Sequence, residues 1–212
     1  MTKDRQIMVV DRATLFAKGY FQGFAPAGYL DYYHIILDNY YYESRDLVET
    51  KPALKQPIAY CVILNKDNSR VFAYQRSTKD GHYEEKRLRG KWSWGIGGHI
   101  DKIDLEGKDP ITTSMLREIQ EETTITTYDD PEVLGYINDD ISEVGQVHFG
   151  LLFLIKTHEN NIKPRDKEIA WGGFLELAEL EDIYSANEAS VETWSGISLI
   201  SIRELLSKNK NA

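Results

Sequence analysis

The sequence lacks the features of a secreted or membrane-spanning protein. It has one cysteine, Cys61, in 212 residues. No internal disulfide can therefore form, and a reducing compartment such as the cytoplasm is expected. The longest apolar run, Val147 to Ile155, is too short to cross a bilayer. Residues 1–10 lack the apolar core of a signal peptide. We therefore expect a cytoplasmic protein with no membrane partner.

The sequence also has fewer basic residues than acidic residues. Lys and Arg number 25 against 34 Asp and Glu, which gives a formal net charge of −9. Such a charge disfavours strong non-specific binding to a nucleic acid duplex or to an anionic membrane. An anionic substrate would therefore need local help, from metal ions or from a small basic patch.

Apolar residues, by contrast, make up 42% of the chain, which is enough for a substantial core. The length suits one domain, or one domain with an extension. We predict an N-terminal extension over 1–56 that packs on a main domain over 57–212, because no flexible Gly/Ser-rich linker separates the two. The aromatic stretch 29–42 within this extension could instead line a ligand pocket or a homodimer contact.

The segment 94–125 organises the rest of the chain. It contains a glycine-rich turn at Gly97-Gly98 and, after it, a helix. Asp109 followed by Pro110 predicts the helix start, since Asp is favoured at the N-cap and Pro at the first helical position. At about 100° per residue, one apolar arc of this helix is formed by Ile111, Met115 and Ile119.

Three glutamates, Glu118, Glu121 and Glu122, lie within five residues of this helix. Glu118 and Glu122 fall beside the apolar arc, and like charges at this spacing cost about 0.2–0.5 kcal/mol even on an exposed helix. A divalent cation that prefers oxygen, Mg²⁺ or Mn²⁺, would offset this repulsion. A solvated helix face is the plainer interpretation. The adjacent Arg117, the upstream glycines and the lack of a Lys or Arg in the next turn of sequence favour the metal site.

These residues resemble the signature of the Nudix hydrolases, in which a glycine and then an acid precede R-E-U-x-E-E-x-G-U, with U aliphatic. Residues 117–125 match the second part at every position but one. Gly98 would be the leading glycine. Asp109 would be the acid, with the expected seven residues between it and Arg117.

Three departures from the signature concern the acid, the second glycine and the spacing. Asp109 replaces the usual Glu, and it could pair with Arg117 or serve only as the N-cap. Thr124 stands where the helix normally leaves through a left-handed glycine, so that exit must be remade. Ten residues separate Gly98 from Asp109 where five are expected. Because the three glutamates are intact, we expect an active variant.

The resemblance implies an α/β fold, a Nudix-like α/β/α sandwich with a mixed sheet, and it extends over 57–206 in element order. Strands are expected at 7–10, 57–64, 70–75, 92–100, 131–137, 147–155 and 168–177, the last with a bend at Gly172-Gly173, and helices at 177–183 and 188–206. The 57–64 and 70–75 strands should form a hairpin. The acidic loop 138–145 could face solvent.

The resemblance also implies the site. Glu118, Glu121 and Glu122 would bind the metal together with a main-chain carbonyl at Gly97 or Gly98, the latter being our choice. Glu118 and Arg117 are the expected catalytic residues. A further downstream acid would be Glu168, or failing that Glu143. His99 could face the site, although a hydrogen-bonded structural histidine is the plainer interpretation.

One basic residue is a candidate substrate ligand. Arg76 lies at a strand end before the charged loop 76–91, and its planar fork of donors suits a phosphate or another acidic group. A solvated loop is the plainer interpretation of this segment. We expect Arg76 and Glu168 to contact the substrate.

The predicted reaction is metal-dependent hydrolysis of a phosphoanhydride bond in a nucleoside diphosphate linked to another group, with a small-molecule diphosphate as substrate. The main alternative is a catalytically weak Nudix-fold module that senses a ligand or binds a protein. Isopentenyl diphosphate isomerases also resemble Nudix proteins, but they use a cysteine in a distinct motif. Cys61 lies in a core-type strand without that motif. An accidental likeness on a plain acidic helix is the remaining alternative.

Overall fold

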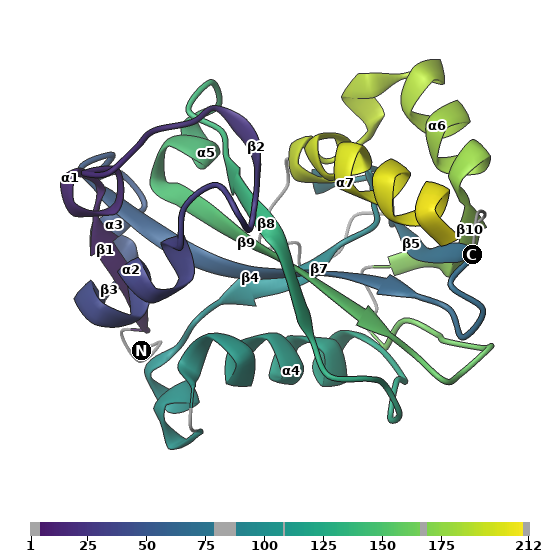
Figure 1. The fold of residues 1–212 in the computed structure, drawn as a ribbon, viewed down its shortest axis with the longest axis horizontal. Coiled ribbons are helices and arrows are strands. Elements are labelled where there is room, and N and C mark those ends of the chain that lie inside the picture. The colour runs from purple at the N-terminus through teal and green to yellow at the C-terminus, as the bar shows by residue number, and fades with distance from the viewer. Residues whose placement is uncertain (1–4, 79–87, 108, 166–168, 210–212) are drawn as a thin grey trace. The chain divides into compact units, whose positions relative to one another are not determined.

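The structure is a computed structural model that describes residues 5–78, 88–107, 109–165 and 169–209 (Figure 1). The chain divides into two compact units. Unit 1 comprises Met1–Tyr60, Gly97–Arg117 and Val133–Phe153, and unit 2 comprises Cys61–Ile96, Glu118–Glu132 and Leu154–Ala212. The predicted division near Gln56 follows a different line, and it stays a prediction.

Unit 1 is built on short antiparallel pairings. Its strands are β1 (Gln6–Asp11), β2 (Gly23–Pro26), β3 (Tyr41–Ser44), β8 (Glu132–Asn138) and parts of β4 (Leu54–Leu64), β7 (Ile96–His99) and β9 (His148–Lys156). Strand β1 pairs antiparallel with β3 and with the start of β4, where Val10 lies opposite Lys55. Strand β2 pairs antiparallel with β8. The order within this unit is β4-β9-β8-β2.

Aromatic packing holds the first 60 residues of unit 1 together. Its helical segments are α1 (Arg12–Leu15), α2 (Tyr32–Asn39), α3 (Arg45–Val48), η2 (Lys102–Glu106), α5 (Glu143–Val147) and the first part of α4 (Pro110–Glu122). Helix α2 lies beside β1 (Figure 1). It buries Tyr32 completely, and the Tyr32 ring lies 5.3 Å from that of Phe149 and 5.1 Å from that of Tyr136. The aromatic stretch therefore supplies core contacts at this position.

Unit 2 contains the predicted hairpin. Its elements are β5 (Arg70–Arg76), β6 (Trp92–Ser93), β10 (Ile169–Glu176), α6 (Leu177–Ala186), η3 (Glu188–Ser190), α7 (Thr193–Asn209) and the second parts of β4 and β9. Leu64 pairs antiparallel with Val71, and the Asn65 side chain accepts hydrogen bonds from two amides of the turn. The order is β10-β5-β4-β9, and α6 and α7 lie beside β5 and β10 (Figure 1).

Two expectations in unit 2 were wrong. The helix expected over 188–206 starts only at Thr193, because Val191 forms a parallel bridge with Trp92 and the Glu192 amide donates to the Trp92 carbonyl at 2.9 Å. The bend expected at Gly172-Gly173 is also absent from the described strand. The β10–β5 ladder runs through both glycines, and its irregularity lies between Ile169 and Trp171.

The turn expected at Gly97-Gly98 was wrong as well. Both glycines lie in β7, within unit 1. A Cβ on Gly97 would overlap the carbonyl oxygen of Ala59 in β4. Glycine is therefore required here because it lets two strands approach closely, and not because it makes a turn.

The apolar core behaves as the sequence predicted. Cys61 is fully buried in β4, and burial raises the pKa of its thiol, as expected of an inert core cysteine. Over the described ranges, no helix is long and apolar enough to span a bilayer.

Candidate active site

Helix α4 begins where the sequence predicted. The carboxylate of Asp109 accepts a hydrogen bond from the Ile111 amide at 3.0 Å and from the Thr112 hydroxyl at 2.6 Å, and Tyr33 also donates to it. Pro110 takes the first helical position. The predicted arc of Ile111, Met115 and Ile119 is fully buried. Asp109 is therefore the N-cap of this helix.

Arg117 pairs with Asp104 of the η2 segment. Its Nε lies 2.9 Å from Asp104 Oδ1 and its Nη2 lies 3.1 Å from Oδ2. Asp104 is only 2% exposed, and it also accepts from the Asp101 amide at 2.8 Å. Between the two roles left open for Asp109, the structure selects the N-cap and gives the ion pair to Asp104.

The end of β7 lies against this arginine. Arg117 Nη2 donates to the His99 carbonyl at 3.2 Å, and the Ser114 hydroxyl donates to the same oxygen at 3.2 Å. Gly98 precedes His99 in β7. The structure therefore brings the glycine strand and Arg117 together within unit 1.

The glutamates occupy the last turn of α4, in unit 2. Glu118 is 9% exposed, Glu122 is partly buried and Glu121 is exposed. The expectation that Glu118 lies beside the apolar arc is confirmed. A carboxylate with so little access to water is costly unless charged or hydrogen-bonding groups compensate for the lost hydration.

Arg76 lies in the same unit, at the end of β5. Its side chain is 17% exposed, its Nε lies 2.9 Å from Glu192 Oε1, and its guanidinium stands 5.5 Å from the centre of the Tyr74 ring. Burial on its own would lower the pKa of Arg76, but the Tyr74 hydroxyl and the carboxylates of Glu192 and Glu122 together raise it. Arg76 is thus a permanently charged group within the electrostatic reach of Glu122. The sequence carried no signal for Glu192, which sits more than 100 residues downstream.

The exit of α4 is remade by the segment 163–165. The Thr124 amide donates to the Lys163 carbonyl at 3.0 Å, and the Thr124 hydroxyl accepts from the Lys163 amide at 3.0 Å. The Arg165 amide donates to the Glu122 carbonyl at 2.8 Å, and the Arg165 side chain donates to the Gln120 carbonyl at 2.8 Å. A neighbouring strand-like segment therefore satisfies the last carbonyls where other helices use a left-handed glycine.

Of the two candidates for a downstream acid, the structure describes only one. Glu168 lies outside the described residues, as does the part of the 76–91 loop at 79–87. Glu143 is the first residue of α5 in unit 1 and is exposed. Both assignments stay predictions.

The acidic loop expected to face solvent forms a buried charge cluster in unit 1. Asp140 accepts from Arg12 Nη1 at 2.9 Å and from Lys55 Nζ at 2.8 Å. Lys55 is fully buried, and it also donates to the carbonyls of Gly145 and His148. Burial lowers the pKa of Lys55, whereas hydrogen bonds from the two cations hold the pKa of Asp140 below its usual range in spite of burial.

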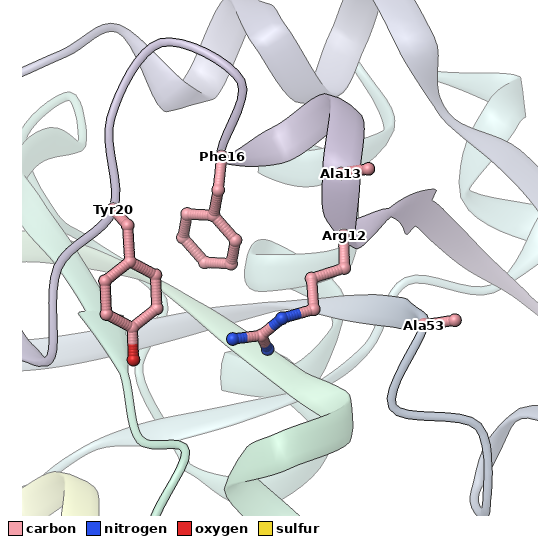
Figure 2. Close-up of a pocket in the computed structure, with 5 residues that line it drawn as sticks. All are labelled: Arg12, Ala13, Phe16, Tyr20 and Ala53. Atoms are coloured by element: carbon pink, nitrogen blue, oxygen red, sulfur yellow. The ribbon is translucent and has the colours of Figure 1, made fainter.

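A shallow pocket of about 390 Å³ adjoins this cluster. It is lined by Arg12, Ala13, Phe16, Tyr20 and Ala53. Figure 2 shows the Arg12 side chain extending towards the rings of Phe16 and Tyr20, and its guanidinium stands 5.2 Å and 5.8 Å from their centres. Because the Arg12 charge is already matched by Asp140, this pocket offers little positive charge to an anionic ligand.

A second cluster of potential metal ligands lies in unit 1. It consists of Glu49, His99 and His148, whose ligand atoms all lie within 4.8 Å of one another. His99 Nε2 is 2.8 Å from Gln56 Oε1 and 3.1 Å from His148 Nε2. Burial lowers the pKa of His99 well below its usual value, and His148 and two arginines add to this effect. The prediction of a hydrogen-bonded His99 is confirmed.

Comparison with known proteins decides the family. The family model described as the NUDIX domain matches residues 54–194 of the 212. The chain belongs to the Nudix family. The relative YmaB of Bacillus subtilis (strain 168) is 36% identical over 154 residues, which cover 69% of this chain and 70% of YmaB.

Solved structures agree with this Nudix assignment. The crystal structure of Tm1382, described as a candidate Nudix hydrolase, has a TM-score of 0.75 and 29% identity, and the match covers 96% of this chain and 99% of that chain. The NUDIX domain of Shewanella oneidensis NrtR, crystallised with ADP ribose, has a TM-score of 0.52, 15% identity and coverage of 72% and 88%, respectively. The predicted α/β fold with a mixed sheet is confirmed, and the family supports a Nudix-type hydrolase in general.

The Arg117 pair also corrects how the Nudix signature maps on this chain. Five residues separate Gly98 from Asp104, as the signature expects. The additional residues therefore lie between Asp104 and Arg117 and not between the glycine and the acid. Asp104 matches the spacing of the signature from Gly98, whereas Asp109 matches its spacing from Arg117.

Proposed function

We propose that this Nudix protein is a divalent-cation-dependent hydrolase that cleaves a phosphoanhydride bond in a nucleoside diphosphate linked to another group. The observation that supports it best is the last turn of α4, where Glu118 is 9% exposed and Glu121 and Glu122 lie within the same turn. Three carboxylates so close together repel one another, and a cation would offset that repulsion.

The donor set fits Mg²⁺ or Mn²⁺. Glu118, Glu121 and Glu122 offer carboxylate oxygens, and Gly98 offers a main-chain carbonyl, which are the ligands that hard divalent cations prefer. When bound, such cations neutralise diphosphate oxygens and lower the pKa of a coordinated water. These four residues are our proposed metal ligands.

The chain's own residues supply the remaining chemistry. Glu118 is the proposed general base that takes a proton from the attacking water, and its low exposure keeps competing water away. Arg117, fixed by Asp104 at 2.9 Å, holds the turn that presents Glu118. A downstream acid, Glu168 or Glu143, is the alternative base.

Arg76 is the proposed substrate ligand. Its guanidinium is held by Glu192 at 2.9 Å, and the Glu122 carboxylate of the glutamate turn is among the groups that raise its pKa. A planar, permanently charged fork suits phosphate oxygens. Glu168, which lies outside the described residues, is proposed as a second substrate ligand.

A screen coupled to alkaline phosphatase tests this function directly, because cleavage of the phosphoanhydride gives phosphomonoesters from which the phosphatase releases phosphate. Nucleotide sugars, dinucleotides and ADP-ribose would be incubated with the full chain in Mg²⁺ or Mn²⁺. ADP-ribose belongs in the screen because it is a nucleoside diphosphate linked to a sugar. We expect turnover on at least one compound, and loss of that turnover on chelation of the metal. A complete screen without metal-dependent turnover would refute the proposal.

A catalytically weak sensing or protein-binding module is the second candidate. It is favoured by Thr124 in place of glycine and by the additional residues between Asp104 and Arg117. Calorimetry with nucleoside diphosphates separates the two functions. Tight binding that needs no metal and releases no phosphate would support the sensor.

Location and assembly follow from sequence arguments alone. One cysteine in 212 residues supports a cytoplasmic protein. The aromatic surface of the first 56 residues supports a homodimer, which light scattering on the purified protein would test.

A further inference from the structure

The histidine cluster of unit 1 collects ligands from four elements that are distant in sequence. Glu49 follows α3, Gln56 lies in β4, His99 ends β7 and His148 begins β9. Gln56 is fully buried, and its Nε2 has no hydrogen-bond partner within the described part of the chain. A buried cluster of imidazole and amide groups needs a physical explanation, although the Gln56 Nε2 group is a donor and would not itself bind a cation.

The hydrogen bonds identify which ring nitrogens face the centre. His148 Nδ1 lies 2.7 Å from the Val144 carbonyl, which can only accept, so Nδ1 carries the proton. The neutral ring therefore turns the lone pair of Nε2 towards His99. A metal-binding histidine is commonly oriented in this way, with its outer nitrogen donating to a carbonyl.

The spacing also fits a metal ion. Two imidazole nitrogens bound at about 2.0–2.1 Å to one tetrahedral ion lie roughly 3.3 Å apart. His99 Nε2 and His148 Nε2 are 3.1 Å apart, so they need to separate by only a few tenths of an ångström. Gln56 Oε1, 2.8 Å from His99 Nε2, is in place as an oxygen ligand.

Glu49 completes the set at the accessible side. Its side chain is 33% exposed, and Arg45 holds its Oε1 at 3.1 Å. A carboxylate can accept from an arginine through one oxygen and bind a metal through the other. The partly exposed carboxylate also gives an ion a route of entry.

The geometry points to a transition-metal site, of the type that takes Zn²⁺, formed by His99, His148 and Glu49 with Gln56 as the fourth ligand. The two imidazoles make this set suit Zn²⁺ and Co²⁺ better than Mg²⁺, which prefers ligands made only of oxygen. On binding, the single proton of the neutral His99 ring moves from Nε2 to Nδ1, so that Nε2 offers its lone pair to the ion, and no redox step is involved. The ion would join the segment after α3 to three strands of unit 1, as a structural site independent of the proposed hydrolysis.

Metal titration of the full chain tests this site. Co²⁺ would be added in a large excess of Mg²⁺, which occupies sites made only of oxygen ligands. We expect one equivalent of Co²⁺ to bind with the visible spectrum of nitrogen ligation, and Zn²⁺ to displace it. Zn²⁺ at 100 times its Kd should raise Tm by about 5–10 °C. Absence of Co²⁺ uptake would refute the site.

Two variants keep the local hydrogen bonds while removing ligands. His148→Asn retains a donor near the Val144 carbonyl, and His99→Gln retains a donor near Gln56. Each should weaken Co²⁺ binding by at least about 100-fold. His158→Gln is the control, because His158 is exposed, lies outside the cluster and has a hydrogen-bond partner of its own, the Asp129 carboxylate at 2.7 Å.

The outcomes separate this site from the proposed active site. Glu118→Gln should keep the Co²⁺ spectrum even if it abolishes hydrolysis, since binding is read without turnover. Melting of each variant without metal reports on its fold, and Glu49→Gln at a partly exposed position provides a third test. Wild-type Co²⁺ affinity in His148→Asn and His99→Gln would overturn the inference.

Discussion

The glutamate turn of α4 and the histidine cluster of unit 1 are assembled in opposite ways. Glu118, Glu121 and Glu122 come from one helical turn and offer only oxygen. The histidine cluster draws His99 and His148 from strands almost 50 residues apart and mixes nitrogen with oxygen. Helical periodicity reveals the first kind of site, whereas the second exists only once the strands have paired.

This difference predicts that one region serves catalysis and the other serves stability. A local turn can lose one side chain without disturbing distant segments, so its residues are free to serve chemistry. A cluster that joins several elements contributes to stability, because removing one member leaves buried partners unsatisfied. Substitutions in the two regions should therefore change different measurements.

The largest effect is expected at Glu118. Glu118→Gln should lower kcat by about 10²–10⁴-fold, the usual contribution of a general base, while the melting temperature hardly changes. Steady-state kinetics on a substrate found in the screen would measure it. Glu49→Gln, in the other region, should leave kcat in Mg²⁺ unchanged.

Glu132→Gln is the matched control for this experiment. Glu132 is an exposed glutamate of the same unit, paired with Lys156 at 3.3 Å. A Glu118→Gln enzyme that is as active as Glu132→Gln would show that the acidic turn is an ordinary helix surface.

Next in size is the effect of Asp140 on stability. Asp140→Asn leaves the fully buried Lys55 without its carboxylate and should lower the free energy of unfolding by about 3 kcal/mol. Urea unfolding at pH 7 measures this. Asp129→Asn, at an exposed aspartate, should stay within about 0.5 kcal/mol of the parent. Equal losses in both variants would mean that the buried cluster has no special role.

The same variant should change the response to acid. Hydrogen bonds from Arg12 and Lys55 lower the pKa of Asp140, although burial opposes them. In the unfolded chain this carboxyl takes up a proton near pH 3.9, but in the folded chain only at lower pH. Its stabilisation is therefore complete above about pH 4 and is lost as the pH falls towards the folded pKa. The parent should lose stability below pH 4 more steeply than Asp140→Asn.

A smaller effect separates the two aspartates near α4. Asp104→Asn breaks the pair with Arg117 and should lower the free energy of unfolding by about 2 kcal/mol, because Asp104 is 2% exposed. Asp109→Asn should cost at most about 0.5 kcal/mol, since Asn is an equally good N-cap. Denaturant unfolding of both variants compares them. A larger loss for Asp109→Asn would restore Asp109 as the acid of the Nudix signature.

Only some of these structural features could be predicted from the sequence. The start of α4, its apolar arc and the 57–64 and 70–75 hairpin were predictable, because each depends on neighbouring residues or on a short period. The three glutamates were visible for the same reason. Asp104 stands at the expected distance from Gly98, whereas Asp109 stands at the expected distance from Arg117. The sequence alone therefore did not show which of the two aspartates pairs with Arg117.

The remaining features depend on contacts that no local pattern reports. Glu192 meets Arg76 because a parallel bridge at Val191 interrupts the predicted helix. In the sequence Asp140 resembles an ordinary loop aspartate, and only the folded structure shows its contacts with Arg12 and Lys55. Gly97 reads as a turn residue, although its role is to let β7 approach β4. In each case the partner lies far away along the chain.

The smallest effect concerns the exit of α4, where the local pattern and the distant contact disagree. Thr124→Gly restores the residue usual in the Nudix signature, so a purely local argument predicts a gain in stability. In this chain the Thr124 hydroxyl accepts from the Lys163 amide, and glycine would lose that bond and gain freedom in the unfolded state. We therefore expect a loss of about 1 kcal/mol in thermal or urea unfolding. Thr126→Gly controls for the general cost of a glycine, because Thr126 is exposed and its hydroxyl contacts the partly exposed Glu159. If Thr124→Gly proved more stable than the parent, the helix would leave by the left-handed route, and the hydrogen bond of the Thr124 hydroxyl would have no part in holding the glutamate turn.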